Sequence, residues 1–273
     1  MNSIMNEIKK FLCAIQFLTT INLKFIEWDE QLTAKSVAYF PAVGILIGCI
    51  LTIAYFILSL VFPNTITAVM LIVIEIIFIR GMHLDGFIDT VDGLFGGMNK
   101  EERLRIMKDT HPGSFGIIAV VLLILLKFTL IFGILNLNMD KFFIAEILIL
   151  MPALGRYAML IPMAIFPYAR DNGTAHWTKF VKKREILTAT LFVLLSAILI
   201  AFVFHLKALV LSLILLSTLI IGAIVFSLML SKYIVSKIGG MTGDTYGAIN
   251  EISEVIVLLL FLSFGNLSLC VFY

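Results

Sequence analysis

The chain has 273 residues, of which 61% are hydrophobic and 14% are charged, whereas about a quarter of an ordinary soluble domain is charged. With a mean hydropathy of +1.08, this composition excludes a soluble globular domain, a disordered chain and a disulfide-stabilised scaffold. It predicts an all-α, polytopic membrane protein, with residues 1–273 forming one integral membrane catalytic domain. The formal net charge of +2 is uninformative, and we expect no nucleic-acid partner.

The first twenty residues carry apolar side chains at helical spacing. Ile4, Ile8, Phe11 and Ile15 fall on one side, and Lys9 falls on the other. This pattern predicts an amphipathic helix over residues 1–20 that lies at the inner leaflet of the membrane. A helix that simply packs against the bundle is the alternative.

Seven apolar segments follow, each close to the roughly 20 residues that cross the hydrocarbon core. The fifth and sixth are so close together that they could form one kinked or re-entrant unit, which leaves six spans as the alternative. The segments comprise residues 37–62, 65–83, 115–135, 142–166, 186–204, 208–230 and 252–272.

Lys and Arg side chains are distributed unevenly between the loops on the two sides of these spans. One side holds sixteen of them, and the other holds Lys141 and Lys207 alone. Because cytoplasmic loops carry the excess of basic residues, we expect the N-terminus and the loops 80–114, 167–185 and 231–251 to face the cytoplasm.

Three carboxylates stand at helical spacing after the second span. Asp85, Asp89 and Asp92 fall within an arc of about 60° on a helix. Such a group repels itself unless a cation joins it, and oxygen ligands suit Mg²⁺. No basic residue lies between Asp85 and Gly97, and four glycines stand in the same segment. We call the three aspartates the carboxylate stripe. We therefore predict that these aspartates bind metal; a solvated acidic helix end is the alternative.

The second span has only about fifteen residues before Arg80, which is short for a crossing. A helix that continues from Thr65 through Asp85 would measure ~30 Å at about 1.5 Å per residue. We therefore expect one continuous helix that places the metal site at the cytoplasmic surface.

Residues 100–109 form a charged segment for which we predict a short surface helix capped by Asn99. Arg103 and Lys108 could bind substrate phosphates, or they could contact lipid headgroups. Asp109 follows and is a candidate catalytic carboxylate.

Residues 239–254 form a second polar segment on the same side of the predicted membrane. Thr242, Asn250 and Glu251 offer substrate-binding groups next to glycine backbone, and Asp244 is a second candidate catalytic carboxylate. Capping of the last helix is the alternative role. We expect the two cytoplasmic segments, 80–114 and 231–251, to form one active site.

Four ionisable residues lie inside predicted spans: Glu75, Lys127, Glu146 and Arg156. Such residues are costly in a membrane unless they are paired or hydrated. Arg156 could bind a substrate phosphate, or it could form an ion pair with Glu146 or Glu75.

Three motifs resemble those of the cobalamin synthase family, whose members are adenosylcobinamide-GDP ribazoletransferases. The first runs His83-Leu-Asp-Gly-Phe-Ile-Asp-Thr-Val-Asp-Gly-Leu-Phe-Gly-Gly97. The second is Met107-Lys-Asp-Thr-His-Pro-Gly-Ser-Phe-Gly116, and the third is Thr242-Gly-Asp-Thr-Tyr-Gly-Ala-Ile-Asn-Glu251. The resemblance covers nearly the whole chain.

The resemblance implies a Mg²⁺-dependent enzyme of the prokaryotic cytoplasmic membrane. It would join α-ribazole, or its 5′-phosphate, to adenosylcobinamide-GDP and release GMP, which is the last assembly step of the cobalamin nucleotide loop. We hypothesise that Asp109 or Asp244 deprotonates the attacking ribazole hydroxyl, and that Arg156 or Arg103 stabilises the phosphate.

Two other functions stay open at this point. Asp89-Thr-Val-Asp-Gly93 matches half of the CDP-alcohol phosphotransferase motif, although the rest of that motif is missing. A transporter would account for the charges inside the spans. Assembly into a homo-oligomer is also left open.

Overall fold

The computed structural model describes residues 2–24, 26–137, 139–171, 173–204 and 209–272. Within these ranges the regular structure consists of α-helices and two short 3₁₀ helices, which confirms the predicted all-α fold. In chain order the elements are α1 (Asn2–Leu18), α2 (Glu30–Ser36), η1 (Val37–Tyr39), α3 (Phe40–Leu58), α4 (Asn64–Phe78), α5 (Met82–Gly96), α6 (Lys100–Ile106), α7 (Ser114–Leu135), α8 (Lys141–Ile165), η2 (His176–Phe180), α9 (Lys183–Phe204), α10 (Leu209–Ile238) and α11 (Gly243–Phe272).

Six segments of the described ranges are long and apolar enough to cross a membrane, namely Glu30–Leu58, Ser114–Leu135, Lys141–Ile165, Lys183–Phe202, Leu209–Ile238 and Gly243–Phe264. A seventh crossing arises if α4 and α5 are counted as one bent span. The expectation of about seven spans, with six as the alternative, is therefore confirmed. The fifth and sixth predicted segments are two long helices, α9 and α10, rather than one kinked unit; residues 205–208 between them lie outside the described residues.

The prediction of one continuous helix from Thr65 through Asp85 is wrong. α4 ends at Phe78, α5 begins at Met82, and the two helices are bent by 89°. Arg80 and Gly81 both have a left-handed backbone, with φ of 56° and 62°, which terminates a right-handed helix. Arg80 is held there by the hydrogen bond that its guanidinium donates to the carbonyl oxygen of Thr19, at 2.6 Å.

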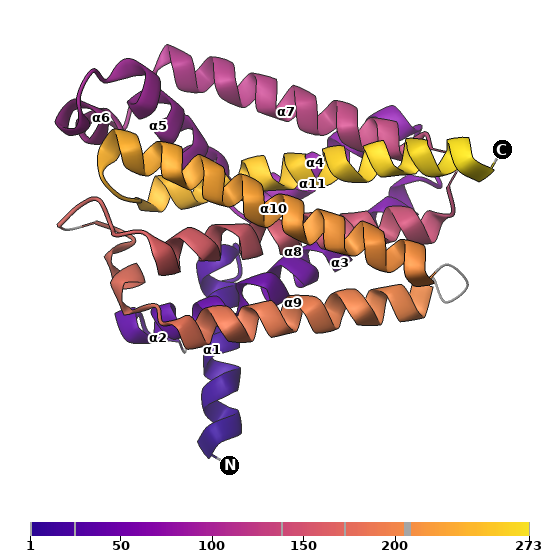
Figure 1. Cartoon of the computed structure of the whole chain (residues 1–273), viewed down its shortest axis with the longest axis horizontal. Coiled ribbons are helices and arrows are strands. Elements are labelled where there is room, and N and C mark those ends of the chain that lie inside the picture. The colour runs from indigo at the N-terminus through magenta and orange to yellow at the C-terminus, as the bar shows by residue number, and fades with distance from the viewer. Residues whose placement is uncertain (1, 25, 138, 172, 205–208, 273) are drawn as a thin grey trace.

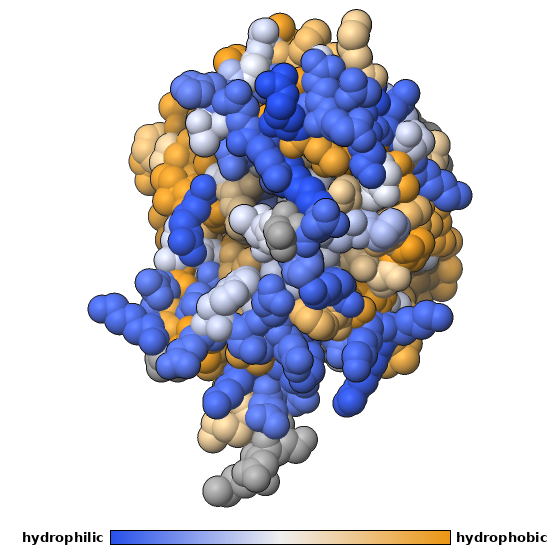
Figure 2. Space-filling view, turned by 90° about the vertical axis from the view of Figure 1, so that its left-hand side faces the viewer, coloured by the Kyte–Doolittle hydropathy of each residue, from blue (hydrophilic) through white to orange (hydrophobic). Residues whose placement is uncertain are grey.

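α5 therefore lies across one end of the bundle and does not extend the span (Figure 1). The same end carries α6, the segment between α8 and α9, and the turn between α10 and α11. We call this end the polar end. Figure 2 views it directly: hydrophilic residues cover it, and hydrophobic residues form the flanks that would face lipid. At the opposite end, the Asn64 amide of α4 donates to the carbonyl oxygen of Leu135 in α7.

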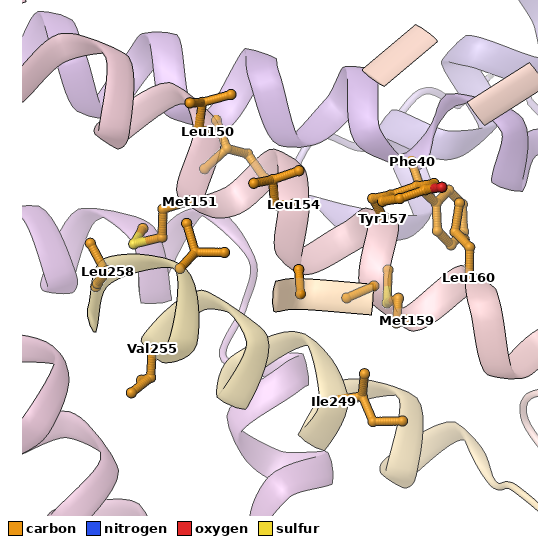
Figure 3. Packing of buried hydrophobic residues seen from close by; sticks show 14 of the residues in the cluster. Phe40, Leu150, Met151, Leu154, Tyr157, Met159, Leu160, Ile249, Val255 and Leu258 are labelled. Atoms are coloured by element: carbon orange, nitrogen blue, oxygen red, sulfur yellow. The ribbon is translucent and has the colours of Figure 1, made fainter. Parts of the chain in front are cut away.

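α8 is the central helix of the bundle, since 94% of its most apolar 18-residue stretch is buried. Gly44 and Gly48 of α3 touch its backbone directly, because an added Cβ at either would lie about 2.5 Å from α8 backbone atoms. Such close approach at small residues is typical of membrane helices. On its other side α8 packs against α11, where Met151 faces Leu258 (Figure 3).

α1 divides into two halves. Ala14 and Leu18 in its C-terminal half are buried against the bundle, whereas Ile4, Met5 and Ile8 in its N-terminal half are exposed. The helix runs steeply across the direction of the long helices (Figure 1). This geometry suits a helix in the plane of a membrane surface, although contact with the inner leaflet stays a prediction.

Candidate active site

The three aspartates of the stripe all lie on α5, between its first and third turns. Asp85 is exposed, Asp89 is partly buried and Asp92 is buried. α5 packs against α7 and α11, and Asp92 is the one of the three that contacts the start of α7. Their surroundings therefore differ, and each has to be considered separately.

Asp92 caps the N-terminus of α7. Its two carboxylate oxygens accept hydrogen bonds from the backbone N–H groups of Gly113, at 2.7 Å, and Gly116, at 2.8 Å. Both glycines are required, because a Cβ at either would lie 2.4 Å from an Asp92 oxygen. Asp92 thus has a structural role, since a carboxylate stabilises the first turn of a helix. Its predicted role as a metal ligand stays untested.

The two predicted cytoplasmic segments meet where α5 contacts the start of α11. A Cβ on Gly86 would lie 2.7 Å from the backbone oxygen of Asp244, so the helices touch at this point. The pKa of Asp89 is raised to about 7 by burial and by the nearby carboxylates of Asp244, Asp85 and Asp92. Carboxylates from both segments therefore contribute to the electrostatic environment of Asp89.

Arg170, a basic residue of the segment between α8 and α9, contacts one of these carboxylates. Its guanidinium lies 3.3 Å from an oxygen of Asp244, which also accepts a hydrogen bond from the Thr242 hydroxyl. The segment after α8 is held there by backbone bonds, because Ala169 donates to Met241 and Met241 donates to Pro167, both at 2.8 Å. No spacing in the sequence signals this approach, since the two segments are about seventy residues apart.

Asp85 lines two cavities. The larger, of about 830 Å³, lies between α1, the segment that follows it and the bend between α4 and α5; Gln16, Glu27 and Trp28 are among its walls. The smaller, of about 330 Å³, reaches Asp244 and is lined by residues such as Trp177. Phe17, Met82 and Asp85 line both cavities.

Three predicted site residues lie on or after α6. Asn99 caps this helix as expected. Arg103 donates from Nε to the carbonyl oxygen of Gly97 at 3.0 Å and from Nη1 to that of Lys237 at 3.3 Å, so it joins α6 to α10. Lys108 is exposed. Asp109 is also exposed, and hydrogen bonds from His111 lower its pKa, which makes it a weaker base than an ordinary aspartate.

Arg156, Asn250 and Glu251 are buried beneath the site, inside the bundle. Arg156 forms an ion pair with Glu254, at 2.8 Å, and Asn250 donates to the same carboxylate. Glu251 lies 3.4 Å from the ammonium of Lys127. These contacts give the three residues a structural role, and their predicted contacts with substrate stay untested.

Lys127 completes this buried ionic cluster, because it also pairs with Glu75 at 2.9 Å and contacts Glu254. The sequence indicated that charges inside the spans need partners. It did not identify Glu254, the carboxylate that joins Lys127 to Arg156. Glu254 lies one helical turn after Asn250, and this spacing was the available signal.

The acids at the polar end fit part of a magnesium shell. Within the described ranges, no three His, Cys, Asp or Glu side chains already converge as a ligand set for a metal ion. Mg²⁺ in phosphate-transfer sites is nonetheless held by one or two carboxylates, with substrate phosphates and water completing its octahedron. Asp85, which lines both cavities, and the half-buried Asp89 one turn further along α5 supply hard oxygen ligands of this kind.

The model of the cobalamin-5-phosphate synthase family matches residues 10–262 of the chain. The "Adenosylcobinamide-GDP ribazoletransferase" of Caldanaerobacter subterraneus subsp. tengcongensis is 36% identical over 258 residues, or 94% of this chain and 99% of that relative. The protein of the same name from Fusobacterium nucleatum is 36% identical over 93% of this chain and 97% of its own length. No solved structure matches the chain.

The matched region includes the three motifs, both cavities and nearly all of the described helices. The chain therefore belongs to the cobalamin-5-phosphate synthase family.

Proposed function

We propose that the protein transfers the adenosylcobinamide phosphate group from adenosylcobinamide-GDP to α-ribazole, or to its 5′-phosphate, and releases GMP. This is the final nucleotide-loop step of cobalamin assembly. Family membership and the names of the relatives support this activity. The observation that carries it is the contact between Gly86 and the Asp244 backbone, which brings two motifs about 150 residues apart into one acidic site.

We further propose that Mg²⁺ is the cofactor and that Asp85 and Asp89 hold it, with Asp92 supporting them from the end of the stripe. A bound magnesium ion would offset the negative charge of the diphosphate and of the departing GMP. The accumulation of carboxylates around Asp89 supports this proposal, because these groups repel one another without a cation.

In the reaction, the 3′-hydroxyl oxygen of ribazole attacks the phosphorus that bears the cobinamide arm. A P–O bond forms to ribazole, the P–O bond to GMP breaks, and the hydroxyl proton passes to a carboxylate. Asp244 is the better candidate for that base, because it lies at the smaller cavity, whereas Asp109 is exposed and bonded to His111. Arg170, which lies beside Asp244, is placed to bind phosphate oxygens.

We propose that the polar end faces the cytoplasm of a prokaryotic cell and that the apolar flanks contact the inner membrane. The excess of basic residues at this end supports the orientation. Soluble GDP- and ribazole-containing substrates would then enter from the cytosol.

The test is to incubate the detergent-purified protein with adenosylcobinamide-GDP, α-ribazole 5′-phosphate and Mg²⁺ and to measure GMP. We expect GMP and the corrinoid product in equal amounts. Release of CMP from a CDP-activated lipid, with no GMP release, would favour a CDP-alcohol phosphotransferase. Solute flux in sealed vesicles without nucleotide release would favour a transporter.

A matched pair of variants tests the role of Asp244. Asp244→Asn should lower kcat at least 100-fold, because the amide cannot accept the proton. Asp140→Asn, at the N-cap of α8 at the opposite end of the bundle, should retain wild-type activity. Equal activity of the two variants would exclude Asp244 from catalysis.

A further inference from the structure

The smaller cavity has the size and wall chemistry of a site for a flat aromatic ligand. Its volume of about 330 Å³ is at the lower end of the roughly 300–1,000 Å³ that ligand sites occupy. A nucleoside fits in this volume, whereas a corrinoid macrocycle is several times larger. Size alone therefore assigns the smaller of the two proposed substrates to this cavity.

Aromatic side chains from three separate elements form one wall of the cavity. The rings of Phe17 and Phe40 stack with centroids 5.8 Å apart, and Trp177 packs edge-on against Phe17 at 5.3 Å. Met159 and Met163 of α8 line it as well. Aromatic faces and methionine sulfur are favourable contacts for a planar aromatic ring.

Two buried polar atoms on the lining residues lack a partner. Trp177 is 2% exposed and His83 is 3% exposed, and among the described residues neither the indole Nε1 nor the imidazole Nδ1 finds a hydrogen-bond partner. Unsatisfied polar atoms are rare in a folded interior. These two lining side chains therefore have unused hydrogen-bonding capacity beside a cavity that suits an aromatic ring.

The lining of the cavity combines acidic and aromatic side chains. Asp85 and Asp244 line it together with Phe17, Phe40 and Trp177. A nucleoside whose base contacts Trp177 would direct its sugar hydroxyls toward these acids.

We propose that this cavity binds the aromatic base of the acceptor nucleoside, and that Phe17, Trp177 and His83 determine its binding. The proposal rests on the proposed function. It leaves the cavity of about 830 Å³, which Asp85 also lines, for a larger ligand, so that each substrate would reach Asp85 from its own cavity.

The experiment compares Trp177→Phe, which keeps a ring but removes the indole N–H, with the wild-type enzyme. We expect the KM for α-ribazole to rise about five- to tenfold, while the KM for adenosylcobinamide-GDP stays within twofold. Phe180→Leu is the matched control, because Phe180 belongs to the same 3₁₀ helix and does not line the cavity. It should leave both KM values unchanged.

Equilibrium dialysis with labelled α-ribazole alone provides a second readout that does not need turnover. Phe17→Ala and Trp177→Phe should each weaken its binding at least fivefold. Unchanged binding and unchanged KM for ribazole would overturn the proposal, as would an equal rise of both KM values. Wild-type protein that binds ribazole but releases no GMP would contradict the proposed function and leave this cavity assignment standing.

Discussion

Glu254 shows most clearly how single residues hold the site in place. Its carboxylate pairs with Lys127 of α7 and with Arg156 of α8, and it also accepts a hydrogen bond from Asn250. All of these groups are buried within the bundle. Because a charge without a partner is very unfavourable there, the cluster fixes the relative positions of α7, α8 and α11.

Glu254→Gln should therefore destabilise the fold strongly. The amide leaves two buried cations without their shared carboxylate, and breaking such a pair costs about 3–5 kcal/mol. Thermal unfolding in detergent would show a lower midpoint. Glu101→Gln, at an exposed position of α6, should leave the midpoint unchanged. Equal midpoints for the two variants would show that the ionic cluster contributes little.

At the scale of the elements, glycine residues allow neighbouring helices to approach each other closely. A Cβ on Gly86 would lie 2.7 Å from an Asp244 backbone atom, whereas one on Gly96 would only touch the side chain of Ile106, at 3.4 Å. Both glycines lie on α5, where Gly86 is buried and Gly96 is the exposed last residue.

Gly86→Ala should separate α5 from α11 and lower kcat at least tenfold. Gly96→Ala should retain activity and unfold at the same temperature or slightly higher, because alanine favours a helix more than glycine does. Assays of GMP release and thermal unfolding of both variants check this. Full activity of Gly86→Ala would contradict a site that needs close contact between the two helices.

The elements also show how far sequence reasoning reaches. The long apolar spans, the Asn99 cap and the location of Asp85, Asp89 and Asp92 on one helix follow from local periodicity, and all were predicted. The bend at Arg80 and Gly81 was missed, because a left-handed arginine depends on a hydrogen bond to Thr19 from another part of the chain. The approach of Arg170 to Asp244 was missed for the same reason, because it is a tertiary contact between residues that no local sequence pattern connects.

At the scale of the whole molecule, the two ends of the bundle differ in character. Hydrophilic residues cover the polar end (Figure 2). The turn after α3 at the other end exposes Leu60, Val61 and Phe62.

Single-cysteine labelling tests this orientation, after replacement of Cys13, Cys49 and Cys270. In intact cells, an impermeant maleimide should label Leu60→Cys, and it should label Glu101→Cys only after the membrane is permeabilised. Both positions are exposed, so accessibility of the side chain is matched. The reverse pattern would place the polar end outside the cytoplasm.

The central claim is that the carboxylates of α5 hold a divalent cation at a phosphate-transfer site. The most direct measurement is GMP release from adenosylcobinamide-GDP as a function of Mg²⁺ concentration, by the wild-type enzyme and by Asp89→Asn at equal protein levels. We predict that the wild-type rate depends on Mg²⁺ and disappears with a chelator, and that Asp89→Asn abolishes release at every concentration. A variant rate within a few-fold of wild type would contradict the claim.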